Sequence, residues 1–319
     1  MSLSQPRRLL MAAACALAGS AGSPDALAAP GHWPLPIAMH EGYPRLEVQL
    51  PGRAEPLAMV LDTAASHTVL DLALAQRLAL VDEGAAQARV EGAAGRAAQM
   101  RQGRRITLRI GGLAHETAPV LLDLSPVQTA TRPVDGILGQ DLLLRHDMRL
   151  DLAAGRLELA TPGSRPQWFA GASCLDNTPR AERPPQAGGF FFADLELRGL
   201  DAASPAARVR AVIDTGASQT LINHAARRAL GVADDDARLR QRPGGTQGVS
   251  AKSAATQLLP IGGLLLAGWQ APPLEVRVSD LPVFDVLGLA GRPAMILGID
   301  VLQQVPLALA AGATRMCLG

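Results

Sequence analysis

Hydrophobic and polar residues alternate along the segment from Tyr43 to Leu50, where Leu46, Val48 and Leu50 are separated by charged or polar positions. A period of two predicts a strand with one buried face. A Pro51-Gly52 turn then leads into a second predicted strand over 57–61. The same pair of predicted strands recurs later in the chain, over 190–197 and 208–213.

Helices are predicted to be few and short. Asp71 and Asn223 each precede a segment rich in Ala, Arg and Leu, so they are expected to cap helices over 72–80 and 224–232. Two hairpin-like pairs are predicted as well, one turning at residues 153–155 and one at 311–312. The pattern therefore indicates a mainly β protein with short helices.

A repeat underlies these parallels. The segment Val60-Leu61-Asp62-Thr63-Ala64-Ala65-Ser66 reappears 152 residues later as Val212-Ile213-Asp214-Thr215-Gly216-Ala217-Ser218. Further landmarks follow in the same order: 92–95 with 245–248, Ile-Gly-Gly at 110 and at 261, and Ile-Leu-Gly-x-Asp at 137 and at 296. Several landmarks in one order predict an internal duplication, with loop insertions explaining small differences in spacing.

Each copy places one aspartate between an apolar run and a turn of small residues. An unpaired carboxylate in apolar surroundings is costly. Two such groups face to face can share one proton, so that one acts as a base and its partner as an acid. The sequence thus predicts that Asp62 and Asp214 activate a water molecule.

Length and charge agree with two lobes and limit the possible partners. The 319 residues are 48% hydrophobic, and they divide into predicted lobes over 29–160 and 190–319 with a linker over 161–189 that is rich in Pro, Gly, Arg and Ala. With 30 Lys and Arg against 29 Asp and Glu, no basic excess points to nucleic acid. No spacing of His and Cys is typical of a metal site, and no phosphate-binding loop occurs, so neither a metal nor a cofactor is expected.

Residues 1–28 have the features of an export signal. Arg7 and Arg8 precede an apolar stretch over 9–18, and the Ala-Leu-Ala at 26–28 forms a cleavage site, with 16–18 as a second candidate. A lipid anchor at Cys15 is an alternative. We expect a periplasmic or secreted protein without a membrane span, which retains Cys174 and Cys317.

The two Asp-Thr motifs and the later Ile-Leu-Gly motifs resemble those of aspartic proteases of the retropepsin and pepsin type. This resemblance implies two homologous small β-barrel lobes, with a cleft between them and a hairpin flap over it. Two lobes in one chain look like the pepsin arrangement. The short lobes and the Ala after the motif look more like exported bacterial retropepsin-like proteins.

The resemblance also assigns roles to individual positions. Asp62 and Asp214 would be the catalytic dyad, Thr63 and Thr215 would interlock the two turns, and Gly216 would direct its amide at a carboxylate. Ala64 departs from the glycine of the family, and its Cβ is expected to be tolerated. Cys174 and Cys317 would be joined in a disulfide between the linker and the C-terminal strand; two separate buried thiols are the alternative.

Substrate contacts are expected from two further sets of residues. Ser66 and Ser218 would line the cleft, or else only hold their own turns. The flap tips, or alternatively plain hairpin turns, would be formed by Gly92, Ala93, Ala94 and Gly95 and by Gly245, Thr246, Gln247 and Gly248.

The sequence therefore predicts a monomeric aspartic endopeptidase that cleaves extended polypeptides without a cofactor. Two alternatives remain. One is a catalytically weak peptide-binding protein, with Ala64 as a sign of lost activity. The other is a self-processing protease that cuts its own linker.

Overall fold

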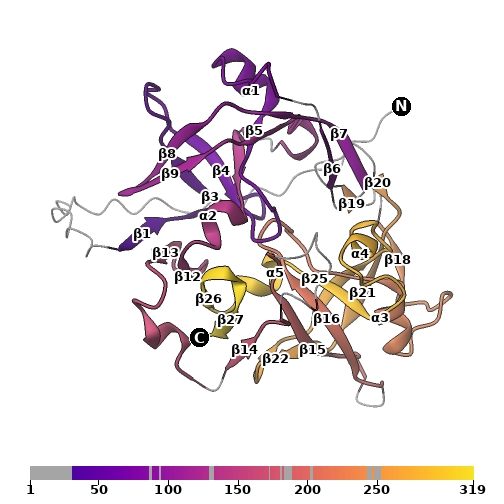
Figure 1. The fold of residues 1–319 in the computed structure, drawn as a ribbon. Coiled ribbons are helices and arrows are strands. Elements are labelled where there is room, and N and C mark those ends of the chain that lie inside the picture. The colour runs from indigo at the N-terminus through magenta and orange to yellow at the C-terminus, as the bar shows by residue number, and fades with distance from the viewer. Residues whose placement is uncertain are drawn as a thin grey trace, which may run out of the picture.

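Strands dominate the computed structural model, which describes residues 31–85, 88–92, 95–128, 133–171, 173–179, 182, 189–201, 204–242, 246–247 and 253–319. Three large sheets organise these residues: one for each lobe and a third shared between the lobes (Figure 1). The first lobe occupies the upper part of this view, the second lobe the lower right and the shared sheet the lower left.

The first lobe is built on an eight-stranded sheet. Its strands are, in spatial order, β2 (Ala38–His40), β3 (Tyr43–Val48), β4 (Leu57–Leu61), β11 (Gly136–Leu138), β5 (Val69–Asp71), β10 (Val120–Leu122), β7 (Gly95–Gln102) and β6 (Ala88–Gly92). A separate hairpin pairs β8 (Ile106–Ile110) with β9 (Leu113–Thr117). The helices of this lobe are α1 (Leu72–Arg77) and α2 (Gln140–Leu143).

The second lobe repeats this plan with a nine-stranded sheet. Its strands are, in spatial order, β18 (Arg240–Gln241), β21 (Gln257–Ile261), β24 (Leu274–Val278), β17 (Leu221–Ile222), β25 (Ala294–Leu297), β16 (Ala207–Ile213), β15 (Phe192–Arg198), β22 (Gly263–Leu266) and β23 (Trp269–Ala271). A further pair joins β19 (Thr246–Gln247) to β20 (Ser253–Ala254). The helices are α3 (His224–Ala229), α4 (Val283–Val286) and α5 (Ile299–Leu302).

A common three-strand unit relates the two lobes. In the first lobe β11 lies between β4, to which it is parallel, and β5, to which it is antiparallel. In the second lobe β25 lies in the same way between β16 and β17. The aspartate motifs directly follow β4 and β16. The predicted duplication is confirmed at the level of topology.

The shared sheet joins the lobes through the two predicted hairpins. Its order is β1 (His32–Pro36), β13 (Arg156–Ala160), β12 (Asp147–Asp151), β26 (Leu307–Leu309), β27 (Arg315–Leu318) and β14 (Cys174–Asp176). Antiparallel pairing of β12 with β26 makes one continuous sheet from both halves of the chain. Strand β14, which lies within the predicted linker, pairs with β27 so that Cys174 is opposite Cys317, and a disulfide joins the two.

Both longer helices begin where the sequence predicts and end earlier. Asp71 accepts a hydrogen bond from the amide of Leu74, and Asn223 accepts one from that of Ala226, each at 2.9 Å, which confirms the two caps. Ala79 and Gly231 have φ of 54° and 72°. These left-handed residues stop the helical hydrogen bonding before residues 80 and 232.

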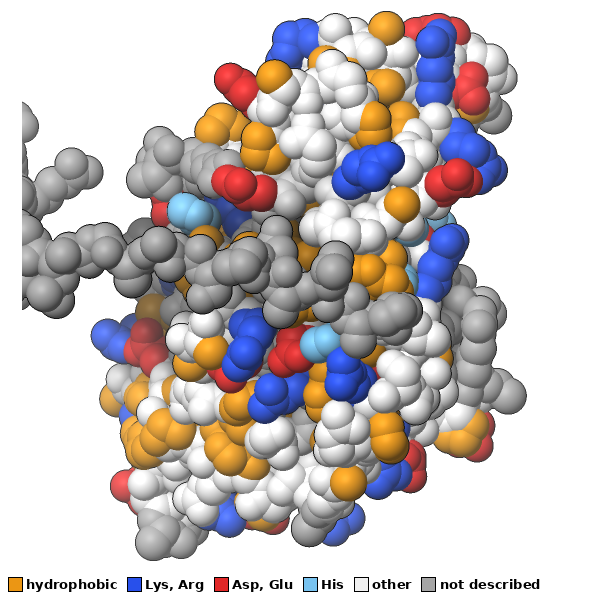
Figure 2. All heavy atoms as spheres, turned by 90° about the vertical axis from the view of Figure 1, so that its left-hand side faces the viewer, with side chains coloured by type: hydrophobic (Ala, Val, Ile, Leu, Met, Phe, Trp, Pro, Cys, Tyr) orange, Lys and Arg blue, Asp and Glu red, His pale blue; other side chains and the backbone are white. Residues whose placement is uncertain are grey.

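The interior is apolar and the surface carries mixed charge. The main core cluster contains buried side chains from both lobes and from the shared sheet. On the face shown in Figure 2, acidic and basic side chains are interspersed, consistent with the balanced composition. Within the described part of the chain, no helix is long and apolar enough to cross a membrane.

Candidate active site

Two buried strands deliver the two aspartates to the same place. All five residues of β4 are buried, as are the last three of β16, so each strand is anchored up to the residue that precedes its aspartate. The amide of Asp62 donates to the carbonyl of Leu138, and that of Asp214 to the carbonyl of Leu297, both at 3.0 Å. These bonds tie each aspartate to the Ile-Leu-Gly strand of its own lobe.

Backbone amides of the turns bind the carboxylates. Oδ1 of Asp62 accepts hydrogen bonds from the amides of Ala64 and Ala65 at 2.7 and 2.9 Å. Oδ1 of Asp214 accepts one from the amide of Gly216 at 2.8 Å. Each turn thus orients its carboxyl group with its own backbone, and these bonds favour the ionised form.

Thr63 and Thr215 lock the two turns together across the interface between the lobes. The Thr63 hydroxyl donates to the carbonyl of Ile213 at 2.8 Å and accepts from the Thr215 amide at 3.1 Å. The Thr215 hydroxyl reciprocates, donating to Leu61 O at 2.8 Å and accepting from the Thr63 amide at 3.0 Å. Both threonines are buried, so four backbone groups of the turns are satisfied without water.

The second turn approaches the first so closely that it needs a glycine. A Cβ added at Gly216 would lie 2.3 Å from Oδ2 of Asp62. Position 64, by contrast, carries a Cβ. Neither Ala64 nor Gly216 has a positive φ, so alanine costs no backbone strain there.

Burial raises the pKa of both carboxyl groups. For Asp62 the increase is opposed by the amides of Ala64 and Ala65. For Asp214 burial and the negative charge of Asp62 together raise the pKa well above its ordinary value. The two groups are close enough to share a hydrogen bond. Two carboxyl groups so close together resist ionising at the same time, which favours one shared proton on the pair.

The Ile-Leu-Gly segments pack directly beneath the turns. A Cβ added at Gly139 would lie 2.5 Å from the backbone of His67, and one at Gly298 would lie 2.7 Å from that of Gln219. The amides of Gln140 and Ile299 donate to the carbonyls of Ala65 and Ala217, both at 2.8 Å. Only glycine permits this approach, which explains the residue in both copies.

Each turn is also supported by a second aspartate from the same motif. Oδ1 of Asp141 accepts from the amide and the hydroxyl of Thr68, at 2.7 and 2.8 Å. Asp300 accepts from the amide and the hydroxyl of Thr220, at 2.9 and 2.6 Å. The repeat of Ile-Leu-Gly-x-Asp contained the signal for these two supports, although sequence reasoning gave them no role.

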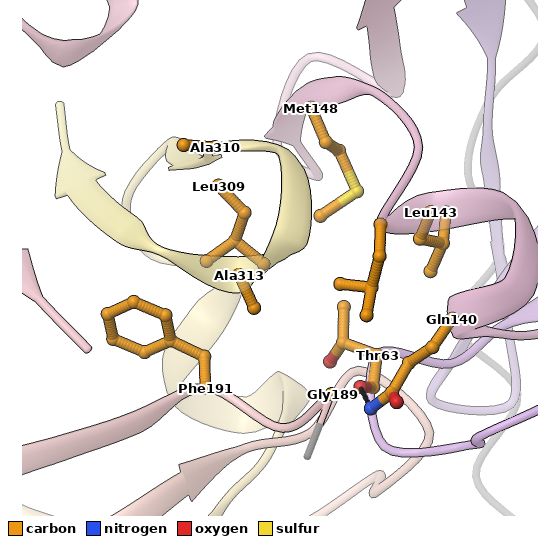
Figure 3. A pocket seen from close by; sticks show the side chains of 10 residues that line it. Thr63, Gln140, Leu143, Met148, Gly189, Phe191, Leu309, Ala310 and Ala313 are labelled. Atoms are coloured by element: carbon orange, nitrogen blue, oxygen red, sulfur yellow. Dashed lines mark hydrogen bonds between the residues drawn. The ribbon is translucent and has the colours of Figure 1, made fainter. Parts of the chain in front are cut away.

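Gln140 is a further support that sequence reasoning missed, and it has no polar counterpart in the second lobe. Its Nε2 donates to the carbonyl of Thr63 at 2.8 Å (Figure 3). A Cβ at Gly189 would lie 2.0 Å from its Oε1, so the chain entering the second lobe packs against this amide. The adjacent cavity of about 20 Å³ is too small for a peptide, so it is no substrate pocket.

The predicted cleft residues lie around the turns, and part of the predicted flaps falls outside the described residues. Ser66 is exposed, with its hydroxyl 3.0 Å from Nδ1 of His67. Ser218 meets the turn between β2 and β3, because a Cβ at Gly42 would lie 3.1 Å from Ser218 Cβ.

The flap segments have hairpin pairing. Gly92 pairs with Gly95 at the end of the β6–β7 hairpin, whereas Ala93 and Ala94 lie outside the described residues. In the second lobe Thr246 and Gln247 form β19, and Gly245 and Gly248 lie outside the described residues. No group of three or more His, Cys, Asp or Glu among the residues that the structure describes is placed to hold a metal ion.

Comparison with known proteins identifies the family. A family model described as aspartyl protease matches the chain twice, over residues 46–142 and 197–301, so each lobe carries one copy. Because these segments span more than half of the chain, it belongs to this aspartyl protease family.

The fold agrees with that assignment. The crystal structure of an aspartic proteinase from Irpex lacteus matches with a TM-score of 0.51 and 13% sequence identity, and the match covers 90% of this chain and 97% of that one. No curated protein sequence matches the chain. The two-lobed, mainly β architecture is therefore that of retropepsin- and pepsin-like proteases.

Proposed function

We propose that this aspartyl protease is an endopeptidase in which Asp62 and Asp214 hydrolyse peptide bonds in extended polypeptides through a bound water molecule. The observation that carries the proposal is the reciprocal locking of the two turns by Thr63 and Thr215, which holds both carboxyl groups at one point. Preorganised geometry of this kind is what acid and base catalysis requires.

The difference between the two carboxyl groups supports a division of labour. Asp62, whose Oδ1 accepts two amides, is the better carboxylate and removes a proton from the water as it attacks the carbonyl carbon. Asp214 carries the shared proton and donates it to the carbonyl oxygen, which gives a tetrahedral diol. When this intermediate collapses, Asp62 gives the proton taken from the water to the leaving nitrogen and the C–N bond breaks. A hydroxyl proton of the diol returns to Asp214, which leaves a carboxylic acid and an amine.

Apolar packing anchors each turn from below. One cluster of buried residues includes Val60 and Ile137 and has Ala65 packed against it. Another includes Val212 and Ile296 and has Ala217 packed against it. Each aspartate turn thus rests on a packed apolar base, which supports the fixed geometry that the proposed reaction needs.

We further propose that the active protein is a monomer outside the cytoplasm. One chain supplies both aspartates, so a partner chain is not needed to complete the pair. The disulfide between Cys174 and Cys317 supports an oxidising compartment, such as the periplasm or the extracellular space.

The experiment that tests this function combines a peptide library with two variants. Wild-type protein is expected to cleave library peptides internally and to bind a statine-type peptide inhibitor. Asp62→Asn and Asp214→Asn should each reduce kcat by about 10⁴-fold, because each removes one partner of the acid–base pair. Circular dichroism and thermal unfolding serve as controls for the fold. Binding of peptides without cleavage by the wild type, or cleavage by Asp214→Asn at the wild-type rate, would contradict the proposal.

A further inference from the structure

An arginine of the second lobe lies directly on the turn that carries Asp214. Arg277 belongs to β24, which runs parallel to β17, and its amide donates to the carbonyl of Thr220 at 3.0 Å. Its Nε donates to Oε1 of Gln219 at 2.8 Å. Gln219 follows Ser218 at the end of the Asp214 motif, so the guanidinium group is held beside the proposed catalytic centre.

The first lobe reaches the same point. Gly42, in the turn between β2 and β3, approaches Ser218 so closely that an added Cβ would be 3.1 Å from the serine Cβ. The next residue, Tyr43, acts electrostatically on Arg277 from the first lobe. Arg277 is therefore placed where the two lobes meet beside the catalytic turns, and not on an outer face of the second lobe.

The charge of Arg277 is not neutralised by an ion pair within the part of the chain that the structure describes. Among the described residues, no carboxylate lies within 4 Å of the Arg277 guanidinium. Asp300 attracts it, but the oxygens of Asp300 already accept hydrogen bonds from Thr220 and Val301. Burial and the like charge of Arg242 lower the pKa of Arg277. A half-buried guanidinium group without a carboxylate partner in the described part of the chain is stabilised by an incoming anion.

We propose that Arg277 binds a carboxylate of the substrate and makes the protease selective for peptides that carry a negative charge near the cleaved bond. The carboxylate can come from an Asp or Glu side chain or from a free C-terminus. A guanidinium fork fixed at Nε by Gln219 presents its remaining N–H groups in the geometry that a carboxylate accepts. This inference rests on the proposed peptidase function and specifies its substrate class.

The test uses matched peptides and one matched control variant. A cleaved library peptide with an amidated C-terminus is resynthesised with Glu or Gln at each position in turn. At the favoured position, we expect Glu to raise kcat/KM by about 10- to 100-fold over Gln, the range for a hydrogen bond to a charged group. Arg277→Gln should bring this Glu/Gln ratio close to one. Arg208→Gln, which removes an exposed arginine from β16 of the same lobe, should preserve it.

Two further measurements are needed. The first distinguishes a side-chain carboxylate from a C-terminal one, and the second tests the charge selectivity independently of the peptidase function. Peptides with free and amidated C-termini, compared in wild type and Arg277→Gln, show whether a chain end is the ligand. Fluorescence anisotropy with the Asp214→Asn variant measures the same Glu/Gln preference as binding, without any cleavage. If binding shows the preference for Glu over Gln and the wild type cuts no peptide, the charge selectivity is supported and the peptidase function is refuted. If peptides are cut but the Glu/Gln ratio is near one, or stays high in Arg277→Gln, the charge selectivity is overturned.

Discussion

The two lobes support their aspartate turns with the same residues but in different electrostatic surroundings. In the first lobe Asp141 also accepts hydrogen bonds from Thr117 at 2.9 Å and from the buried His115 at 3.3 Å. Burial opposes ionisation, but the bonds from His115, Thr68 and Thr117 and the charge of His115 lower the pKa of Asp141 to about 2. In the second lobe burial raises the pKa of Asp300, and the bonds from Thr220 only partly compensate.

This difference shows which features a duplicated site needs and which can diverge. The hydrogen bonds from Thr68 and Thr220 hold the backbone of the turn in both lobes, so the aspartate and the threonine occur in both. Neither Asp141 nor Asp300 is among the groups that shift the pKa of Asp62 or Asp214, so the charge of each support was able to diverge. Three positions differ between the lobes. Ala64 corresponds to Gly216, Gln140 corresponds to Ile299, and the support that His115 gives to Asp141 has no histidine counterpart at Asp300 among the described residues. Four predictions test how far the two lobes differ.

The disulfide should give the largest effect, although it is attached to only one hairpin of the shared sheet. It joins β14 to β27 of the second-lobe hairpin, whereas the first-lobe hairpin of β12 and β13 has no such link. Cys174→Ala with Cys317→Ala should lower the free energy of unfolding by about 2–4 kcal/mol, because the bond closes a long loop in the unfolded chain. Urea unfolding measures this value. An unchanged free energy of unfolding in the double variant would contradict this contribution.

Reciprocal exchange at positions 64 and 216 should show that the two turns are not interchangeable. Gly216→Ala places a Cβ on the Asp62 carboxyl group, and a displacement of this kind should lower kcat by about 10²-fold. Ala64→Gly, the matched control, should change kcat by less than about 3-fold. The alanine is unstrained, and the backbone amide of residue 64 still donates its hydrogen bond to Asp62 Oδ1 in the variant. Equal changes in kcat for Gly216→Ala and Ala64→Gly would show that the two positions are interchangeable and would contradict the prediction.

The contributions of Asp141 and Asp300 to the free energy of unfolding should change in opposite directions as the pH rises. The stabilisation from Asp141, whose pKa is lowered to about 2, is fully present above its ordinary value of 3.8 and is lost as the pH falls through 2. That from Asp300, whose pKa is raised, is present below 3.8 and is lost as the pH rises through its higher folded value.

Asn substitutions separate these two contributions. We expect Asp141→Asn to cost about 1–2 kcal/mol more at pH 5 than at pH 2. The cost of Asp300→Asn should fall over the same rise in pH. Urea unfolding of both variants and the wild type across this range provides the measurement, and parallel pH curves for the two variants would refute the difference.

The smallest effect concerns Ala65 and Ala217, at positions where pepsin-like enzymes commonly have a hydroxyl residue that donates to the outer carboxylate oxygen. Without that donor the raised pKa values keep the shared proton to higher pH, so we expect activity at mildly acidic pH that falls once the proton is lost. Ala65→Ser and Ala217→Ser should each move the alkaline limb of the kcat/KM profile down by about one pH unit. Unchanged profiles in both variants, or a wild-type optimum in strong acid, would show that the argument is wrong.

The sequence alone determined the local features and the repeat. Alternation at 43–50 predicted β3, Asp71 and Asn223 predicted the starts of α1 and α3, and the repeated Asp-Thr motif predicted two related lobes. These features depend on short-range physics, in which a cap, a turn or a buried strand face is specified within a few residues. The resemblance to aspartic proteases added the interlocked threonines, and in the structure Thr63 and Thr215 form hydrogen bonds that bridge the two turns.

Only the tertiary structure decided the contacts between segments far apart in the chain. The pairing of β12 with β26, the approach of Gly216 to Asp62, the bond from Gln140 to Thr63 and the meeting of Arg277 with Gln219 all join distant residues. The reason is physical: alternation specifies which face of a strand is buried but not which strand lies beside it, and one Cβ decides a contact only after both backbones are in place. Gly216 and Ala64 occupy equivalent positions in the repeat, and the packing of the two lobes makes glycine necessary at only one of them.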